Sequence, residues 1–266
     1  MKKLKNLRNK LDFFLRRNIR FSRKYYGKNE LKEGLFDHLS GQKHLIAIEK
    51  ERLYYEKYNL EYLKNNSTKR NYLENLAIIE LLENYLEIDK NNVKILDIGS
   101  KNWFYAPGEY NFFKYNGFEK TIWLDGVEID AFRVYSDLRS RYDYACYYAK
   151  GLANCRYLAE DALKQQGKYD YITWFFPFVT EIPLLEWGLP LSEFKPSELL
   201  KHAANLLEIG GSMIIVNQDK HEYSIQEEML KKLNLNYIQK GSFTNSFLQF
   251  EHGRYIMLVN SKYSDL

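Results

Sequence analysis

Between residues 93 and 217, apolar stretches of strand length end at glycine, acidic or proline residues, and polar segments separate them. Apolar runs of this length, bounded by turn-forming residues, are typical of buried strands. A glycine pair, Gly210 and Gly211, indicates the end of a helix and the entry to a further strand. The pattern therefore predicts five strands, at residues 93–100, 126–130, 155–162, 169–177 (broken by its proline) and 212–216.

Two more strand-like stretches lie near the C-terminus, at residues 236–240 and 254–259. Turn-forming residues follow the first stretch at 241–245 and precede the second at 251–253, where they include Glu251 and His252. No segment with helical periodicity lies between the two stretches. We therefore expect them to pair as an antiparallel hairpin rather than through a crossover.

Residues 1–90 show helical periodicity throughout and predict an all-helical N-terminal extension before a second unit at 91–266. Apolar residues recur at helical spacing over residues 45–63 and again from Leu73 to Leu86. Ser67 and Thr68 are candidates to cap the second of these helices, in a polar break at 64–71. Residues 41–90 could form a cover packed on one face of the sheet or a lid over an acceptor pocket.

The first 26 residues carry ten lysines and arginines and one acid, Asp12, which gives +9, whereas the whole chain is +4. The remainder is therefore −5. Leu4, Leu7, Leu11 and Phe14 lie at helical spacing, which predicts a basic amphipathic helix. Such a helix suits an anionic membrane surface or a nucleic-acid backbone, and the alternative is a solvated helix that packs its leucines on the body.

Composition is compatible with a soluble enzyme. The chain has 266 residues, of which 45% are hydrophobic and 28% charged, enough for one large core with an appended helical region. No apolar run reaches the roughly 20 residues that span a bilayer, and no signal-peptide core is present, so we expect a cytoplasmic protein that could contact a membrane peripherally. Cys146 and Cys155 are expected to be reduced and buried.

Candidate chemistry lies where the predicted strands end. Asp97-Ile98-Gly99 follows the first strand and Glu128 ends the second. A glycine lets a ligand approach the backbone, and an acid at the next strand end can accept hydrogen bonds from a ribose diol. These residues indicate a nucleoside-containing cofactor, although the full G-x-G-x-x-G fingerprint of dinucleotide sites is missing.

The order Asp97-x-Gly99, Glu128, Asp161 and the Gly210-Gly211 strand entry resembles the class I S-adenosylmethionine-dependent methyltransferases from about residue 93 to 260. The resemblance implies a doubly wound, mostly parallel seven-stranded α/β sheet closed by an antiparallel hairpin. It also implies S-adenosylmethionine as cofactor. The contacts implied by the resemblance are Asp97 and Gly99 for the methionine part, Glu128 for the ribose, and Asp161 for the adenine, and the neighbouring Ser100, Lys101 and Ala162 are further candidates for cofactor binding.

Each of these residues also has a structural interpretation. Asp97 could cap the following helix, Glu128 could be a solvent-facing strand end, and Asp161 could be an N-cap. Asp130 is expected to cap a helix that begins at Ala131. Lys101 is assigned to the cofactor carboxylate from its charge and position alone.

The acceptor is expected beside the loop at 174–183, after the fourth strand. Glu109 and Glu181 are the candidate proton acceptors there. Enzymes that methylate amino groups of nucleic acids carry Asn, Asp or Ser before a Pro-Pro pair at this point. This chain has Phe175 and Phe176 before Pro177 instead, which disfavours methylation of a nucleic-acid base. Aromatic residues that could line the acceptor pocket are Trp103, Phe104, Tyr105 and Tyr110.

The sequence therefore predicts a methyltransferase acting on an unidentified small molecule. Three alternatives stay open: a non-catalytic cofactor- or nucleotide-binding protein of the same fold, a methyltransferase acting on RNA or a membrane-associated substrate, and an enzyme that uses another nucleotide cofactor.

Overall fold

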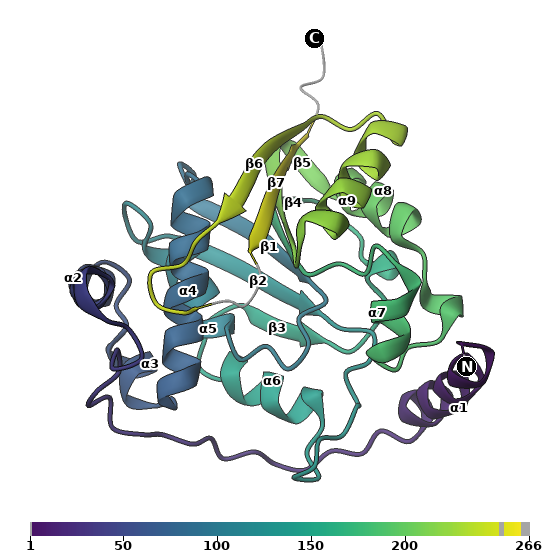
Figure 1. The fold of residues 1–266 in the computed structure, drawn as a ribbon, viewed down its shortest axis with the longest axis horizontal. Coiled ribbons are helices and arrows are strands. Elements are labelled where there is room, and N and C mark those ends of the chain that lie inside the picture. The colour runs from purple at the N-terminus through teal and green to yellow at the C-terminus, as the bar shows by residue number, and fades with distance from the viewer. Residues whose placement is uncertain (1, 250–252, 262–266) are drawn as a thin grey trace.

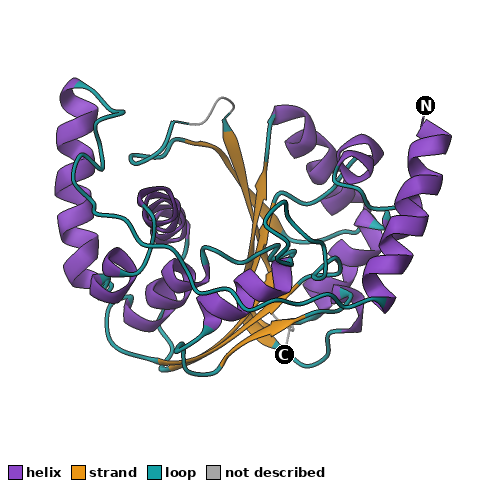
Figure 2. Ribbon diagram, turned by 90° about the horizontal axis from the view of Figure 1, so that it is seen from below, coloured by secondary structure: helices purple, strands orange, loops and turns teal. Residues whose placement is uncertain are grey.

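A computed structural model describes residues 2–249 and 253–261. In this part of the chain, seven strands form one sheet with helices on both of its faces (Figures 1 and 2). The strand order is β3-β2-β1-β4-β5-β7-β6. The strands are β1 Asn92–Ile98, β2 Thr121–Val127, β3 Cys155–Leu158, β4 Tyr169–Phe175, β5 Leu207–Asn217, β6 Tyr237–Phe243 and β7 Arg254–Asn260.

Strands β1 to β5 are parallel, and β7 is antiparallel to both β5 and β6. The prediction of a mostly parallel, doubly wound sheet with an antiparallel C-terminal hairpin is confirmed. Of the turn predicted before the last strand, Glu251 and His252 lie outside the described residues. Gly241 lies inside β6, where the pairing with β7 shifts register.

The two faces of β1 belong to different hydrophobic clusters, as expected for a central strand covered on both sides. Val93 and Ile95 pack in the cluster with helices α2, α4, α5 and α6. Leu96 and Ile98 pack in the cluster with α8 and α9. The helices are α1 Lys2–Asn18, α2 Gly41–Lys57, α3 Glu61–Asn65, α4 Lys69–Tyr85, α5 Ala106–Tyr115, α6 Arg141–Ala149, α7 Glu181–Glu186, α8 Pro196–Asn205 and α9 Lys220–Lys232, with 3-10 turns η1 Ala162–Lys164 and η2 Leu191–Glu193.

The N-terminal region is helical only in part. Thr68 caps α4 as predicted, because its side chain accepts a hydrogen bond from the Asn71 amide. Residues 19–40 form no helix and run along one side of the molecule from α1 to α2 (Figure 1), so the expectation of helix throughout is wrong there. Gly27 and Gly34 adopt φ values of +80° and +62°, which interrupt a right-handed helix.

The basic helix forms, but it packs on the body through the face opposite its leucines. Asn9 and Phe13 are the buried residues of α1. Leu4 and Leu7 are 74% and 65% exposed, so the leucines do not pack on the body as the solvated-helix alternative expected. Hydrogen bonds from Asn9 and Arg16, together with the buried Phe13 side chain, hold α1 on the body instead of the leucines.

Two local predictions need correction. No helix begins at Ala131; the next helix is α6, and Ser140 caps it in a capping box with Asp143. The Gly210–Gly211 pair does not end a helix either, because α8 ends at Asn205 and the glycines lie inside β5. Gly210 has a φ of +76° beside the register shift between β4 and β5, which explains why the pair resembles a helix end in sequence.

Candidate functional site

A cavity of about 650 Å³ lies at the carboxyl edge of the parallel strands. Residues that follow β1, β2, β3 and β4 all line it, together with α7 and the start of α9. The cavity therefore lies where open α/β sheets bind their ligands. The predicted cofactor residues that line it are Gly99, Lys101, Glu128, Asp161 and Ala162.

Gly99 forms the tight turn after β1. Its φ is +75°, a conformation that glycine adopts without strain. Its amide donates a hydrogen bond of 2.9 Å to the carbonyl of Val127 on the adjacent strand β2. A Cβ added to Gly99 would meet no protein atom within 4 Å, so the backbone is open to a ligand at this point.

Asp97 and Ser100 lie beneath this turn and do not line the cavity. The Asp97 carboxylate accepts a hydrogen bond of 2.7 Å from the Tyr105 hydroxyl. The Ser100 hydroxyl donates to the Asp97 carbonyl at 3.0 Å. Both residues therefore fix the shape of the turn.

The buried carboxyl groups of Asp97 and Glu109 both lie within hydrogen-bond distance of the Thr173 hydroxyl. Thr173 Oγ1 lies 3.1 Å from Asp97 Oδ1 and 2.6 Å from Glu109 Oε1, and both carboxyl groups are fully buried. Burial raises the pKa of both groups, and the nearby charge of Asp97 raises the pKa of Glu109 further. A hydroxyl donates only one proton. A proton held by either carboxyl group can be donated to Thr173, which leaves the Thr173 hydroxyl to donate to the other carboxyl group.

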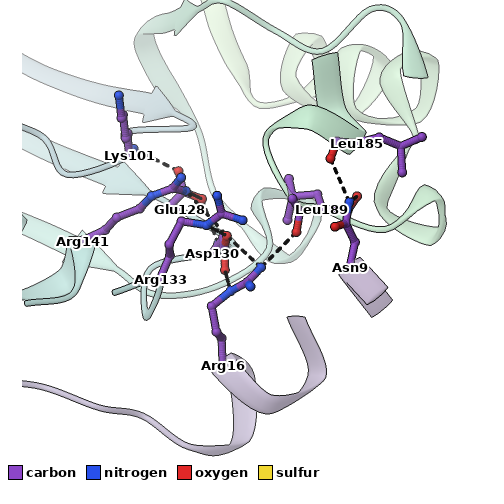
Figure 3. A network of polar contacts seen from close by, with 10 residues as sticks. Asn9, Arg16, Lys101, Glu128, Asp130, Arg133, Arg141, Leu185 and Leu189 are labelled. Carbon is purple, nitrogen blue, oxygen red and sulfur yellow. Dashed lines mark hydrogen bonds and ion pairs between the residues drawn. The ribbon is translucent and has the colours of Figure 1, made fainter. Parts of the chain in front are cut away.

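Glu128 directly follows β2, and its buried carboxylate accepts hydrogen bonds from three N–H donors. Its Oε2 accepts the Lys101 amide at 2.9 Å, and its Oε1 accepts the Asp130 amide at 2.8 Å. Arg141 Nη1 lies 3.4 Å from Oε1 (Figure 3). The acid is therefore oriented by the backbone of the two loops beside it, and its charge is balanced by one buried arginine.

Asp130 is the centre of an arginine cluster that sequence reasoning missed. Arg16 of α1 and Arg133 donate to its two carboxylate oxygens at 2.7 and 2.8 Å, and Arg141 lies 3.8 Å away (Figure 3). The guanidinium of Arg141 also lies 4.8 Å from the ring centre of Trp187, which lines the cavity. Arg133 lies only three residues from Asp130, whereas Arg16 lies 114 residues away, so the complete cluster forms only in the tertiary structure.

Asp161 has the capping role that was its alternative interpretation and also lines the cavity. Its Oδ1 accepts a hydrogen bond of 3.0 Å from the Leu163 amide, at the start of the 3-10 turn η1. Ala162 and Leu163 line the cavity beside it. The two roles are compatible, since capping fixes the position of the carboxylate.

Neither predicted proton acceptor lies at the cavity. Glu109 is fully buried behind the turn after β1, and Glu181 forms an ion pair with Lys2 of α1. Glu222, in the first turn of α9, lines the cavity instead. Burial raises its pKa, and its Oε2 accepts the Gln218 amide at 3.1 Å. Glu222 could have been predicted from the sequence, because it lies just after the carboxyl end of β5, at the edge of the sheet where ligands bind.

Among the residues that the structure describes, eight aromatic side chains line the cavity, and two of them are predicted ones. Phe104 and Tyr105 line the cavity. Trp103 and Tyr110 are core residues of the cluster on the α4 and α5 side of the sheet. Further aromatic lining comes from Trp174, Phe175, Phe176, Phe178, Trp187 and Phe194.

Cys146 and Cys155 are free thiols, but Cys146 is exposed on α6 and Cys155 is half-buried, so neither is fully buried as expected. Within residues 2–249 and 253–261, no group of three or more His, Cys, Asp or Glu side chains could hold a metal ion. No helix in these ranges is long and apolar enough to cross a membrane.

No family model matches the chain, and no curated protein is similar to it in sequence. Among solved structures, one described as a class I S-adenosylmethionine-dependent methyltransferase from Listeria monocytogenes has a TM-score of 0.50 and 15% identity, with 98% of this chain and 90% of that one covered. Magnesium protoporphyrin IX methyltransferase from Synechocystis has a TM-score of 0.46 and 12% identity over 90% of this chain and 100% of that one. TrmN from Thermus thermophilus has a TM-score of 0.47 and 13% identity over 71% of this chain, which spans about half (49%) of TrmN. At such identities likeness shows the fold alone, and the Listeria structure, with a TM-score of 0.50, supports that fold.

Proposed function

We propose that this chain, which has the class I S-adenosylmethionine-dependent methyltransferase fold, binds S-adenosylmethionine and transfers its methyl group to an acceptor in the same cavity. One observation carries the proposal: Gly99, Glu128 and Asp161 follow three adjacent strands and line one cavity. That edge of a parallel sheet is where cofactors bind.

The cavity fits this cofactor at three points. The open space at Gly99 admits the methionine portion to the backbone. A carboxylate has about four acceptor positions, and Glu128 uses three of them, so Oε2 keeps capacity for a ribose hydroxyl. Asp161 and Ala162 lie beyond the next strand, in place for the adenine.

The acceptor that best suits the remaining wall is a small, flat, largely apolar molecule. Phe176, Phe178 and Phe194 line the cavity together with Trp187. When bound, the cofactor supplies an electrophilic methyl group on a sulfonium. The protein's part is then to hold the acceptor atom in line with that methyl group and to exclude water.

Glu222 is the residue we assign to proton removal from the acceptor. It lines the cavity from α9, and burial raises its pKa, which makes the carboxylate a better base near neutral pH. Arg254, which also lines the cavity, limits this shift because its positive charge favours the ionised carboxylate. Glu109 and Glu181 are not assigned this role because neither lines the cavity.

A second candidate is a cofactor-binding protein without transfer activity. Glu128 already holds Arg141 and two backbone amides, so only part of its acceptor capacity faces a ribose. The turn after Gly99 also continues with Ser100, Lys101 and Asn102, where further glycines would widen the approach to the backbone.

Calorimetric titration with S-adenosylmethionine, S-adenosylhomocysteine and NAD tests the cofactor. Binding of the first two but not of NAD supports the proposal, and binding of none contradicts it. Incubating the protein with a cell extract and methyl-labelled S-adenosylmethionine then tests transfer, with heat-inactivated protein as control. Tight cofactor binding without any labelled product would favour the non-catalytic alternative.

A further inference from the structure

The inward face of helix α1 is fixed to the body by specific polar contacts. Asn9 Nδ2 donates to the carbonyls of Leu185 and Leu189 at 2.9 and 3.0 Å (Figure 3). Arg16 binds Asp130 at 2.7 Å and the Gly188 carbonyl at 3.0 Å. These contacts set the orientation of the helix about its own axis.

The outward face of α1 is an apolar stripe, which we define as Leu4, Leu7, Leu11 and Phe14. These side chains are 74%, 65%, 59% and 62% exposed. Each residue of the stripe precedes an inward-facing residue by two positions, the inward ones being Asn6, Asn9, Phe13 and Arg16. Two positions turn a helix by slightly more than half a turn, so the stripe points away from the body.

Positive charge flanks the apolar stripe. Lys3, Lys5 and Lys10 form no salt bridge with any residue within 2–249 or 253–261. Lys2 and Arg16 bind acids of the body, and Arg8 lies 3.5 Å from Asp12. Lys3 and Lys10 lie four and three residues from Leu7 and therefore next to the stripe, on a chain whose remaining sequence is net negative.

We propose that the outward face of α1 docks on an anionic lipid bilayer, with the apolar stripe among the headgroups and Lys3 and Lys10 beside lipid phosphates. A helix with an apolar face and flanking lysines lies in the plane of such a surface. Each lysine near an anionic bilayer adds to its binding. A nucleic-acid backbone would use the cations but leave the four apolar side chains in water, and a second copy would bring two strongly positive segments together.

Docking through α1 would also fix how the cavity faces the bilayer. The inward contacts of α1 are to Leu185, Gly188 and Leu189, in the segment that also places Trp187 and Leu189 in the cavity wall. The lipid proposal does not depend on the proposed function, because its test measures vesicle binding and not methyl transfer.

Flotation of the full-length protein with phosphatidylcholine vesicles, with and without phosphatidylglycerol, tests the proposal. We expect binding only to the anionic vesicles, with a part that persists at high salt because the stripe inserts. The double variant Leu7→Ser/Leu11→Ser should reduce this binding at least tenfold without lowering the melting temperature, because both side chains are exposed. Substitutions are preferable to deletion, since Arg16 holds Asp130 next to Glu128.

Leu45→Ser/Leu53→Ser on α2 is the matched control, because these leucines are 67% and 47% exposed on a helix with mixed charge. Equal loss of binding in this control would overturn the proposal, as would no binding to anionic vesicles at low salt. Binding to single-stranded RNA that falls log-linearly with salt and is unchanged in the α1 variant would assign the face to nucleic acid instead. A dimer that the α1 variant dissociates, in the absence of vesicle binding, would assign it to a second copy.

Discussion

Replacing Glu128 with glutamine is the most direct test of the cofactor site. The carboxylate accepts the Lys101 amide on Oε2 and the Asp130 amide on Oε1, at 2.9 and 2.8 Å. A glutamine side chain has one acceptor oxygen, and its NH₂ group would face one of these two N–H donors. The ribose hydroxyl would then lose its negatively charged acceptor.

The expected loss follows from the strength of a hydrogen bond to a charged group, about 1.5–3 kcal/mol. At about 1.4 kcal/mol for each factor of ten, the Kd for S-adenosylhomocysteine should rise by roughly 10- to 150-fold. Alanine would be a poorer choice. It would leave two backbone donors unpaired and Arg141 with Asp130 as its remaining carboxylate partner, so that lost affinity and lost stability would be mixed.

Calorimetry with S-adenosylhomocysteine should be combined with thermal unfolding of each variant, so that only folded protein is compared. Glu193→Gln is the matched control, because Glu193 also lines the cavity but lies on the exposed turn η2. Its affinity should stay within about twofold of the parent protein, since no binding contact is assigned to it. An unchanged Kd in folded Glu128→Gln protein would refute the ribose assignment.

Three further predictions concern other residues of the site. Gly99→Ala should weaken S-adenosylmethionine binding at least about tenfold, because its Cβ would occupy the space left for the ligand. The control is Gly117→Ala, since Gly117 has a similar φ of +80° and equally open surroundings. This control should lose only about 1–2 kcal/mol of stability through backbone strain. Equal binding by both variants in calorimetry would show that Gly99 serves folding alone. Glu109→Gln should stabilise the protein increasingly, relative to the parent, as pH rises. Burial raises the pKa of Glu109 in the folded state above its ordinary value of 4.5, so above that pH the folded state binds more protons than the unfolded state. The stability of the parent protein therefore falls as pH rises towards the raised pKa. A melting-temperature difference between Glu109→Gln and parent that is constant from acid to neutral pH would contradict this account. Glu222→Gln should lower kcat by about 100-fold for an acceptor that must lose a proton, with the Kd for S-adenosylmethionine unchanged. The activity of the parent protein should fall as pH drops through the raised pKa of Glu222, and the activity of the variant should not show this fall. Retention of the acidic limb of the pH–rate profile in this variant, measured on an acceptor from the extract screen, would exclude Glu222 as the base.

Two residues that conflicted with the sequence predictions, Glu109 and Asp130, have partners far away in the chain. Glu109 looked like a free acid near the cofactor turn. In the structure it is buried against Thr173, 64 residues away. Asp130 looked like a helix cap, yet its partners are Arg16, 114 residues away, and two arginines of the following loop and helix.

The sequence by itself located the strand ends at which Gly99, Glu128 and Asp161 stand, because strand formation depends on local apolar runs and turn residues. The second strand was predicted wrongly at 126–130, since β2 is Thr121–Val127 and Glu128 follows it. The sequence also determined that α1 is an amphipathic helix. Only the tertiary structure decided which face of α1 packs. The hydrophobic effect has no direction, so the leucines favoured burial without specifying a partner, while the hydrogen bonds of Asn9 and Arg16 to the α7 region and Asp130 require one orientation and leave the leucines in contact with solvent.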